Sequence, residues 1–334
     1  MSDLIAKPNE HRFAPYVRIL GKGKTGSRSL TREEARAAMA MILRGEVKDV
    51  QLGAFLMLLR VKEESADELT GFVEAARETI GAPISLGVDV DWSSYAGKRK
   101  QLPWFLLSAL TLADHGVRVF MHGAGGHTKG RLYTESALNA LGISTCETWM
   151  DVERHLATSS FAFMPLRNIC PPLQAMIDLR NDFGLRSPVH TLVRLLNPLA
   201  APYSIQSVFH PSYALNHQQA AIDLQQPHAA VFKGEGGEIE RRPEALSKVY
   251  SVHAGVASEE AWPKLVEGRQ EEAEQLDIEL LRDIWQGTRS DEYGELAIVG
   301  TLAIVLRLLQ KVHSPEAAIG LARRYWEQRN RERL

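Results

Sequence analysis

The densest run of positive charge in the sequence lies in one short segment. Lys98, Arg99 and Lys100 follow Gly97 and directly precede Leu102–His115, whose apolar residues recur at helical spacing. A helix N-terminus offers free N–H groups and positive partial charge, so cations beside it favour a phosphate or another anion. A solvated basic turn explains the same residues equally well. The segment therefore indicates an anion site, and leaves open whether the anion belongs to a small substrate or to a polymer.

Two further loops carry residues suited to phosphate or metal. The Gly123–Gly130 loop contains Lys129 and is followed by Arg131. Glycines between a strand and a helix let the backbone approach a phosphate, although they are at least as often a plain turn. The loop 234–242 is acidic, and paired carboxylates can hold Mg²⁺. Because Ile239 interrupts the adjacent acidic pair that such a site requires, we predict no metal site and no cofactor.

The remaining residues of interest are isolated along the chain. Histidines are scattered, and none lies beside a nucleophile and an acid in a triad pattern, so we predict structural or surface roles for them and name no catalytic residue. Further cations that could contact phosphate lie in the basic loop 21–28 and in later segments: Lys22, Lys24, Arg28, Arg186, Arg194 and Lys233.

Two kinds of sequence pattern predict the elements that position these residues. Residues 1–83 read as a small helical domain, in which Thr31 and Ser65 each begin a helix with a glutamate three residues later. Residues 1–18 are expected to be an arm that packs only in context. After residue 83 the pattern becomes strand, loop, helix, repeated, which predicts an α/β domain with a parallel sheet. We expect Ile84–Val90 to open this sheet, and the acidic stretch Glu259–Gln286 to be largely helical.

Composition excludes several classes of protein. The chain has 334 residues and a formal net charge of −2, with 39 basic and 41 acidic residues. No apolar run is long enough to span a membrane, and no signal core is evident, so we expect a cytoplasmic protein with two free cysteines. The segment Val256–Glu295 carries 12 acidic and 4 basic residues. A basic face opposite an acidic lobe would fit this asymmetry, and evenly alternating surface charge is the simpler interpretation.

The order of segments resembles the anthranilate phosphoribosyltransferase superfamily, and within it the YbiB-type branch of nucleic-acid-binding proteins. The resemblance implies a helical domain over 1–83 with helices of about 171–197 returning to it, an α/β domain over 84–170 and 198–334, and a homodimer. The motifs that carry it are Gly21–Lys24, Gly45–Val47, Leu58–Lys62, Ser94–Gln101, Phe163–Pro165, Cys170–Leu173, Gly184–Arg186, His190–Leu192 and Ser207–Pro211.

Departures from the enzyme pattern concentrate in its substrate loops. The enzyme has Gly-Thr-Gly-Gly-Asp where this chain has Gly97–Gln101, and Lys-His-Gly-Asn-Arg where this chain has Met121–Gly125. Its magnesium-binding Asp-Glu pair aligns with Ile239 and Glu240, while Arg180 is retained near the expected anthranilate pocket. The resemblance thus implies a former substrate cleft around Gly97, His122, Gly123, Arg180 and Glu240. Loss of the metal and of oriented donors should cost roughly a thousandfold or more in rate.

Three functions remain open at this point. The first is sequence-independent binding of nucleic acid, DNA with RNA as the open alternative, through phosphate contacts that need no base readout. The second is a phosphoribosyltransferase with an altered substrate, which would need Mg²⁺. The third is a scaffold that binds a protein through the acidic lobe. We favour the first, with these residues as phosphate contacts: Lys98, Arg99, Lys100, Lys22, Lys24, Arg28, Lys129, Arg131, Arg186, Arg194 and Lys233.

Overall fold

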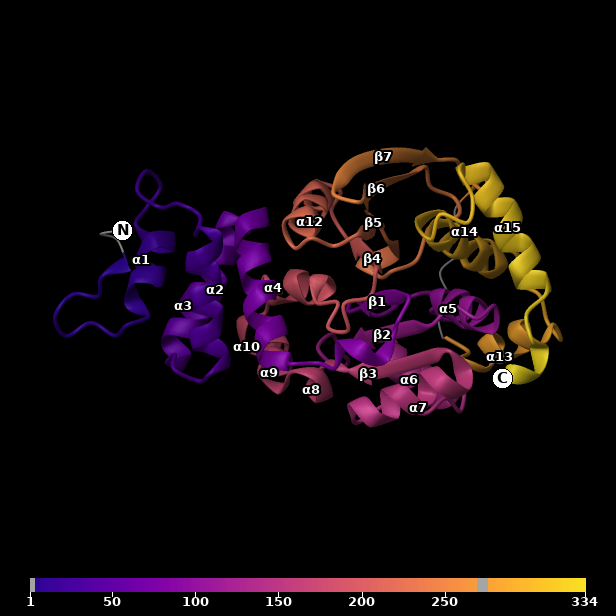
Figure 1. The fold of residues 1–334 in the computed structure, drawn as a ribbon, viewed down its shortest axis with the longest axis horizontal. Coiled ribbons are helices and arrows are strands. Elements are labelled where there is room, and N and C mark those ends of the chain that lie inside the picture. The colour runs from indigo at the N-terminus through magenta and orange to yellow at the C-terminus, as the bar shows by residue number, and fades with distance from the viewer. Residues whose placement is uncertain (1–3, 269–275) are drawn as a thin grey trace.

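A helical unit and a larger α/β domain lie side by side along the long axis of the molecule (Figure 1). The computed structural model describes residues 4–268 and 276–334. The first part consists of helices, and the second contains a β-sheet covered by helices, as the sequence predicts. No helix within these described ranges is both long and apolar enough to cross a membrane.

Four helices build the N-terminal unit: α1 Ala14–Gly21, α2 Arg32–Leu43, α3 Asp49–Lys62 and α4 Ala66–Ile80. The Thr31 and Ser65 hydroxyls accept from the backbone N–H of Glu34 and Glu68, and both glutamates return the bond, so both capping boxes are formed. The first 18 residues are not only an arm, because Phe13, Pro15 and Tyr16 are buried at the start of α1.

A chain of short helices runs between the sheet and the N-terminal unit. Buried residues of this segment, such as Leu173, Ile177 and Leu192, belong to the same hydrophobic core as the buried residues of α2, α3 and α4. The Arg77 guanidinium of α4 donates to the carbonyl oxygens of Leu195 and Leu196, which ties the two parts together. The elements of this segment are α8 Leu166–Ile169, α9 Pro171–Asp178, α10 Arg180–Phe183, α11 Val189–Leu192 and the 3-10 helix η3 Val193–Leu195.

The sheet has seven strands in the order β3-β2-β1-β4-β5-β6-β7. The pairs from β3 to β5 are all parallel, whereas β5–β6 and β6–β7 are antiparallel. Strand order reverses direction between β1 and β4, which makes this the topological switch point. The strands are β1 Val90–Ser94, β2 Val119–Gly123, β3 Phe161–Pro165, β4 Tyr203–Val208, β5 His228–Lys233, β6 Ser247–His253 and β7 Val256–Trp262.

Helices cover both faces of this sheet. Side chains alternate between the faces along each strand, so Val119 and Met121 join the core under α5 and α14 while Phe120 joins the core under α7. The covering helices are α5 Phe105–Asp114, α6 Thr134–Ala140, α7 Trp149–Ser159, α12 Ser212–Asp223, α13 Glu279–Gln286, α14 Glu292–Leu308 and α15 Pro315–Glu327. Short 3-10 turns complete the description: η2 Ile84–Leu86, η4 Glu235–Gly237 and η5 Arg331–Arg333.

Two expectations about this domain are wrong. Ile84–Val90 does not form the first strand, because Ile84–Leu86 is a 3-10 turn and β1 begins only at Val90. The acidic stretch from Glu259 does not begin as a helix, because residues to Trp262 belong to β7. Ala254 and Gly255, with φ of 50° and 80°, form the two-residue turn that folds β7 back on β6. Residues 269–275 of the predicted helix lie outside the described residues.

Candidate anion site at the carboxyl edge of the sheet

Four loops that the sequence singles out meet at one edge of the sheet. They follow β1, β2, β4 and β5, and the carboxyl ends of parallel strands lie together. Ligands of open α/β sheets bind in the crevice at such an edge, outside the switch point between β1 and β4. The loop after β1 contains Gly97 and Lys98, and the loop after β5 contains Glu235 and Glu238, so these two loops face each other across the switch point.

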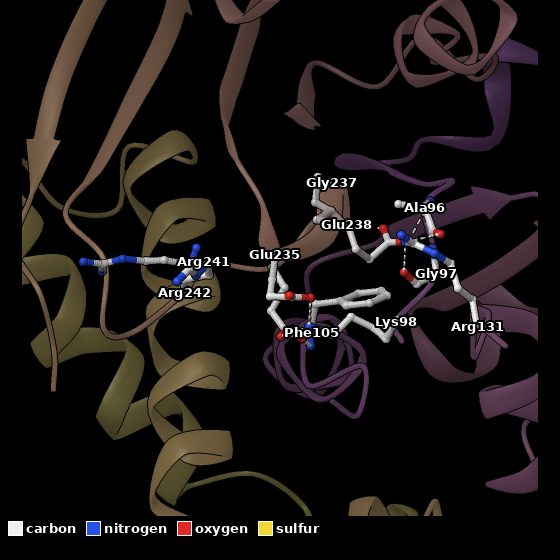
Figure 2. A network of polar contacts seen from close by, with 12 residues as sticks. Ala96, Gly97, Lys98, Phe105, Arg131, Glu235, Gly237, Glu238, Arg241 and Arg242 are labelled. Atoms are coloured by element: carbon white, nitrogen blue, oxygen red, sulfur yellow. Dashed lines mark hydrogen bonds and ion pairs between the residues drawn. The ribbon is translucent and has the colours of Figure 1, made fainter. Parts of the chain in front are cut away.

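Lys98 is not part of an exposed basic surface. Its side chain is fully buried, with Nζ 2.6 Å from Glu240 Oε1 and 2.9 Å from Glu235 Oε2 (Figure 2). Burial alone would lower the pKa of Lys98, but the two carboxylates outweigh it and raise the pKa above its usual value. The expected contact between Lys98 and a nucleic-acid phosphate is therefore wrong, because the ammonium has no route to an external ligand.

Carboxylates of the chain itself occupy the backbone donors of this region. Oε2 of Glu238 accepts from the N–H groups of Ala96 and Gly97, at 3.0 and 2.7 Å (Figure 2). Oε2 of Glu240 accepts from the N–H of Phe105, the first residue of α5, at 2.9 Å. The helix N-terminus predicted to hold an external anion thus already holds an internal one.

Gly97 keeps this loop closely packed. Its φ is 68°, and a Cβ at this position would lie 2.9 Å from the ring of Tyr133. Nη1 of Arg131 donates hydrogen bonds to the carbonyl oxygens of Ala96 and Gly97, each at 2.9 Å. The loop is therefore fixed on its N–H side by Glu238 and on its C=O side by Arg131.

A cavity of about 380 Å³ lies next to this sealed loop, between the helical unit and the carboxyl edge. Arginines dominate its lining and come from four separate parts of the chain: Arg60, Arg131, Arg180, Arg186 and Arg194. Glu64 is the one carboxylate among the lining residues that the structure describes. We call this cavity the arginine cleft.

Arg180 and Arg194 are held mainly by carbonyl oxygens. Arg180 donates to the carbonyl oxygen of His127 at 2.7 Å, and Arg194 donates to carbonyl oxygens of His190, Ser207 and Gly237. Carbonyl groups orient a guanidinium without neutralising it. Across the described part of the chain, Arg186 makes no hydrogen bond and no ion pair at all.

The pKa values of the cleft report this concentration of charge. Burial, together with Arg131, Arg194 and Arg180, lowers the pKa of Arg186 to about 10. Burial, together with Arg186, Arg180 and Arg131, lowers the pKa of His127 to about 4. Both directions mean that an additional positive charge is unfavourable here, so the cleft favours an anion.

The other expected site residues fall into two groups. His122 and Gly123 lie inside the sheet: Tyr95 Oη is 2.7 Å from His122 Nδ1, and Asp91 Oδ1 is 3.1 Å from His122 Nε2, with all three side chains buried. They do not reach the arginine cleft. Seven of the expected cations are exposed and lie outside its lining: Lys22, Lys24, Arg28, Arg99, Lys100, Lys129 and Lys233.

Sequence reasoning missed part of the cleft. Arg60 and Glu64 come from α3 and the turn after it. Phe209 directly follows β4, and Tyr213 and His217 lie on α12. Arg60 lies in the motif Leu58–Lys62, but nothing in that motif indicates a site residue, and no motif contains Tyr213. A detectable signal existed only at Phe209, which directly follows an apolar strand at the carboxyl edge of the predicted sheet.

The residues present do not fit Mg²⁺. The Lys98 ammonium lies between Glu235 and Glu240, where a cation held by these carboxylates would have to lie. Ile239 beside them is fully buried in the apolar core. Within the described ranges there is no group of three or more side chains that could hold a metal ion.

The fold agrees with comparisons to known proteins. Two sequence models match: the helical bundle domain of a glycosyl transferase family over residues 15–80, and the α/β domain of the same family over residues 104–327. The chain belongs to this family of anthranilate phosphoribosyltransferase-like proteins. The resemblance seen in the sequence is thereby confirmed at the level of the superfamily.

Relatives within the family include proteins of known and unknown activity. The chain is 31% identical over 242 residues to the uncharacterized protein YbiB of Escherichia coli, covering 71% of this chain and 75% of the relative. It is 30% identical over 247 residues to anthranilate phosphoribosyltransferase of Beijerinckia indica, covering 73% and 70%. The name of the Escherichia coli relative states no activity.

Solved structures of family members show the same fold. Anthranilate phosphoribosyltransferase of Thermus thermophilus superposes with a TM-score of 0.75 at 22% identity, covering 93% of this chain and 94% of that one. The Saccharomyces cerevisiae enzyme in complex with PRPP and Mg superposes with a TM-score of 0.77 at 16% identity, covering 97% and 96%. The helical domain followed by a mixed, mainly parallel sheet is the fold of this family.

Proposed function

We propose that this protein binds nucleic acid through the phosphate backbone, without reading base sequence. The observation that carries the proposal is the arginine cleft, where five arginines line one cavity beside a single carboxylate. Arginine guanidinium groups suit phosphate because their planar fork can donate two parallel hydrogen bonds. The exposed cations Arg99 and Lys129 lie on loops that start from the same edge of the sheet, and Lys233 is the last residue of β5 at that edge, so all three extend the positive surface beyond the cleft.

Phosphoribosyl transfer is the alternative, and the family relation together with the retained Arg180 supports it. The sealed loop opposes it. Transfer from a diphosphate needs metal and oriented donors to neutralise developing charge. In this chain Glu238 holds the backbone donors of Gly97, and Lys98 holds the carboxylate of Glu240. We therefore propose binding without transfer, and we expect no Mg²⁺-dependent heat when phosphoribosyl diphosphate is titrated into the protein.

Fluorescence anisotropy of a labelled oligonucleotide across a salt series tests the proposal. Between 50 and 200 mM salt the affinity should fall by on the order of 10³, the loss expected when about six phosphates are neutralised. Arg180→Gln combined with Arg186→Gln should weaken binding and make the salt slope shallower by about two, since each lost phosphate contact removes about one. Arg324→Gln is the matched control, because α15 lies on the far side of the α/β domain (Figure 1).

Two results would contradict the proposal. One is an affinity that does not change with salt. The other is equal binding by the wild type and by the doubly substituted protein. The homodimer implied by the resemblance remains a separate prediction, which light scattering at several protein concentrations tests.

A further inference from the structure

Arg186 is the residue of the arginine cleft whose charge is least explained by the protein itself. Its side chain is partly buried, and it forms no hydrogen bond or ion pair with any residue in the ranges 4–268 and 276–334. Burying a cation without a partner costs free energy, because its hydration is lost and nothing replaces it. An external anion would supply the missing partner.

The neighbouring arginines also have donors to spare. Arg131 and Arg180 each use Nη1 on carbonyl oxygens, and their Nη2 atoms donate to no residue in the described ranges. Arg194 forms the floor of the cleft and is held by Ser207 and Gly237. Among the lining residues that the structure describes, Glu64 is the one carboxylate, and burial raises its pKa.

The excess of positive charge in the cleft favours some phosphate ligands over others. A phosphodiester carries one negative charge, whereas a phosphate monoester carries close to two at neutral pH. Arg131, Arg180 and Arg186 form no ion pair with a carboxylate in the described ranges, and the dianion compensates their charges better than a monoanion does. A cavity of about 380 Å³ is at the lower end of the range for small-molecule sites and is too small for a duplex, so a terminal group suits it better than the middle of a helix.

Apolar side chains line the same cleft. Phe209 and Leu185 line the cleft and are 52% and 54% exposed, so both offer apolar surface to a ligand. The ring of Phe209 lies edge-on to His210, with ring centroids 4.6 Å apart, so the two rings form one aromatic corner. An exposed aromatic ring beside arginines is the arrangement on which a nucleobase stacks.

We propose that the arginine cleft binds a phosphate monoester of a nucleotide, with Arg131, Arg180 and Arg186 around the phosphate and the base against Phe209. The monoester belongs either to the end of a nucleic-acid strand or to a free mononucleotide. This inference rests on the proposed function, because it assigns the end of the bound strand to the cleft and its backbone to the surrounding cations.

Three oligonucleotides of one sequence test the inference: one with hydroxyl groups at both ends, one with a 5′-phosphate and one with a 3′-phosphate. Anisotropy at fixed salt should show at least one phosphorylated form binding about tenfold more tightly than the hydroxyl form. Arg186→Gln should reduce this ratio to nearly one, while Arg324→Gln should leave it unchanged. Phe209→Ala should weaken the phosphorylated form more than the hydroxyl form.

Competition separates the two sources of the monoester. If adenosine 5′-monophosphate displaces the phosphorylated strand at submillimolar concentration and inorganic phosphate does not, the cleft takes a free nucleotide as well. If neither competes but the end preference holds, the ligand is the end of a strand.

The failures of the two proposals are distinguishable. Equal affinity for all three strands, with no binding of the mononucleotide by calorimetry, would overturn the inference and leave the proposed function intact. Absence of binding by all three strands at low salt would remove the proposed function, and measured binding of the mononucleotide would then leave the cleft as a nucleotide site.

Discussion

Nζ of Lys98 lies 2.6 Å from Oε1 of Glu240, and both side chains are buried. The two residues come from loops 142 positions apart, at opposite sides of the switch point between β1 and β4. Their ion pair joins the loop after β1 to the loop after β5. The Lys98 ammonium thus lies at Glu240, the carboxylate that the enzyme pattern assigns to magnesium. The Glu238 carboxylate accepts hydrogen bonds from the N–H groups of Ala96 and Gly97.

Replacing Lys98 by methionine should destabilise the protein by about 3–5 kcal/mol. Methionine fills a similar volume but leaves the Glu240 carboxylate buried without its partner, which is the costly way to break a buried pair. Urea unfolding followed by circular dichroism measures the loss. Arg99→Met is the matched control, because Arg99 is the exposed neighbour and should change stability by less than about 0.5 kcal/mol.

Adding Glu240→Gln to Lys98→Met should recover part of that loss. The double variant removes both charges, so its loss of unfolding free energy should be smaller than the sum of the losses in the two single variants. A difference of about 1–3 kcal/mol is expected for residues in direct contact. Additive losses would mean that the two charges do not interact and that packing alone accounts for the effect.

Glu238→Ala should open the loop after β1 to an external anion. The substitution frees the N–H groups of Ala96 and Gly97, which now donate to the Glu238 carboxylate, and leaves them near a helix N-terminus. We expect the variant to lose about 1–3 kcal/mol of stability and to regain part of it with inorganic pyrophosphate. Thermal unfolding with and without pyrophosphate measures this. A wild-type protein that is stabilised equally would show that the loop is already accessible.

The helical unit could be predicted from sequence because its signals are local. Thr31 with Glu34, and Ser65 with Glu68, lie three residues apart and form the capping boxes that the pattern indicates. The apolar spacing of the following residues then gives each helix its buried face. In the same way, the repeated strand, loop and helix pattern after residue 83 indicated a parallel sheet, which strands β1 to β5 form.

The site was harder to predict because its partners are distant in sequence. Three adjacent cations indicated one anion site, yet Lys98 turns inward to Glu240 while Arg99 remains exposed, and nothing local distinguishes the two. Arg60 joins the cleft from α3 only through the packing of the helical unit against the α/β domain. The β7 strand was missed because its acidic residues look helical, and its turn, Ala254–Gly255, lacks the usual asparagine or aspartate.

Stability should fall as the pH drops from about 6.5 to 4, and His127 should contribute to the fall. Its pKa in the folded protein is lowered to about 4 by burial and by the cleft arginines, from an ordinary value of 6.5. Between these values the unfolded chain binds a proton that the folded protein does not, so unfolding is favoured as the pH decreases. The full difference corresponds to about 3 kcal/mol.

A comparison of the wild type with His127→Gln isolates this contribution from that of the carboxylates. Urea unfolding at pH 7.5, 6, 5 and 4.5 should show a shallower decline in the variant. Equal slopes in the two proteins would mean that His127 titrates near its ordinary pKa. A ligand that carries negative charge should flatten the wild-type slope, because it offsets the arginines that lower the pKa of His127.

Ile239→Asp should not restore binding of Mg²⁺, although it recreates the acidic pair of the enzyme pattern. Two features oppose the metal: the Lys98 ammonium remains between Glu235 and Glu240, and the new carboxylate would be buried among apolar side chains. The single variant should therefore lose stability, by about 3 kcal/mol or more, and show no heat with Mg²⁺ or Mn²⁺ by calorimetry. Adding Lys98→Ala removes the internal cation, and only this double variant should be stabilised by Mn²⁺ in thermal unfolding. Binding of the metal by Ile239→Asp alone would show that Lys98 yields to a divalent cation, and phosphoribosyl transfer would then regain weight as the function of this fold member.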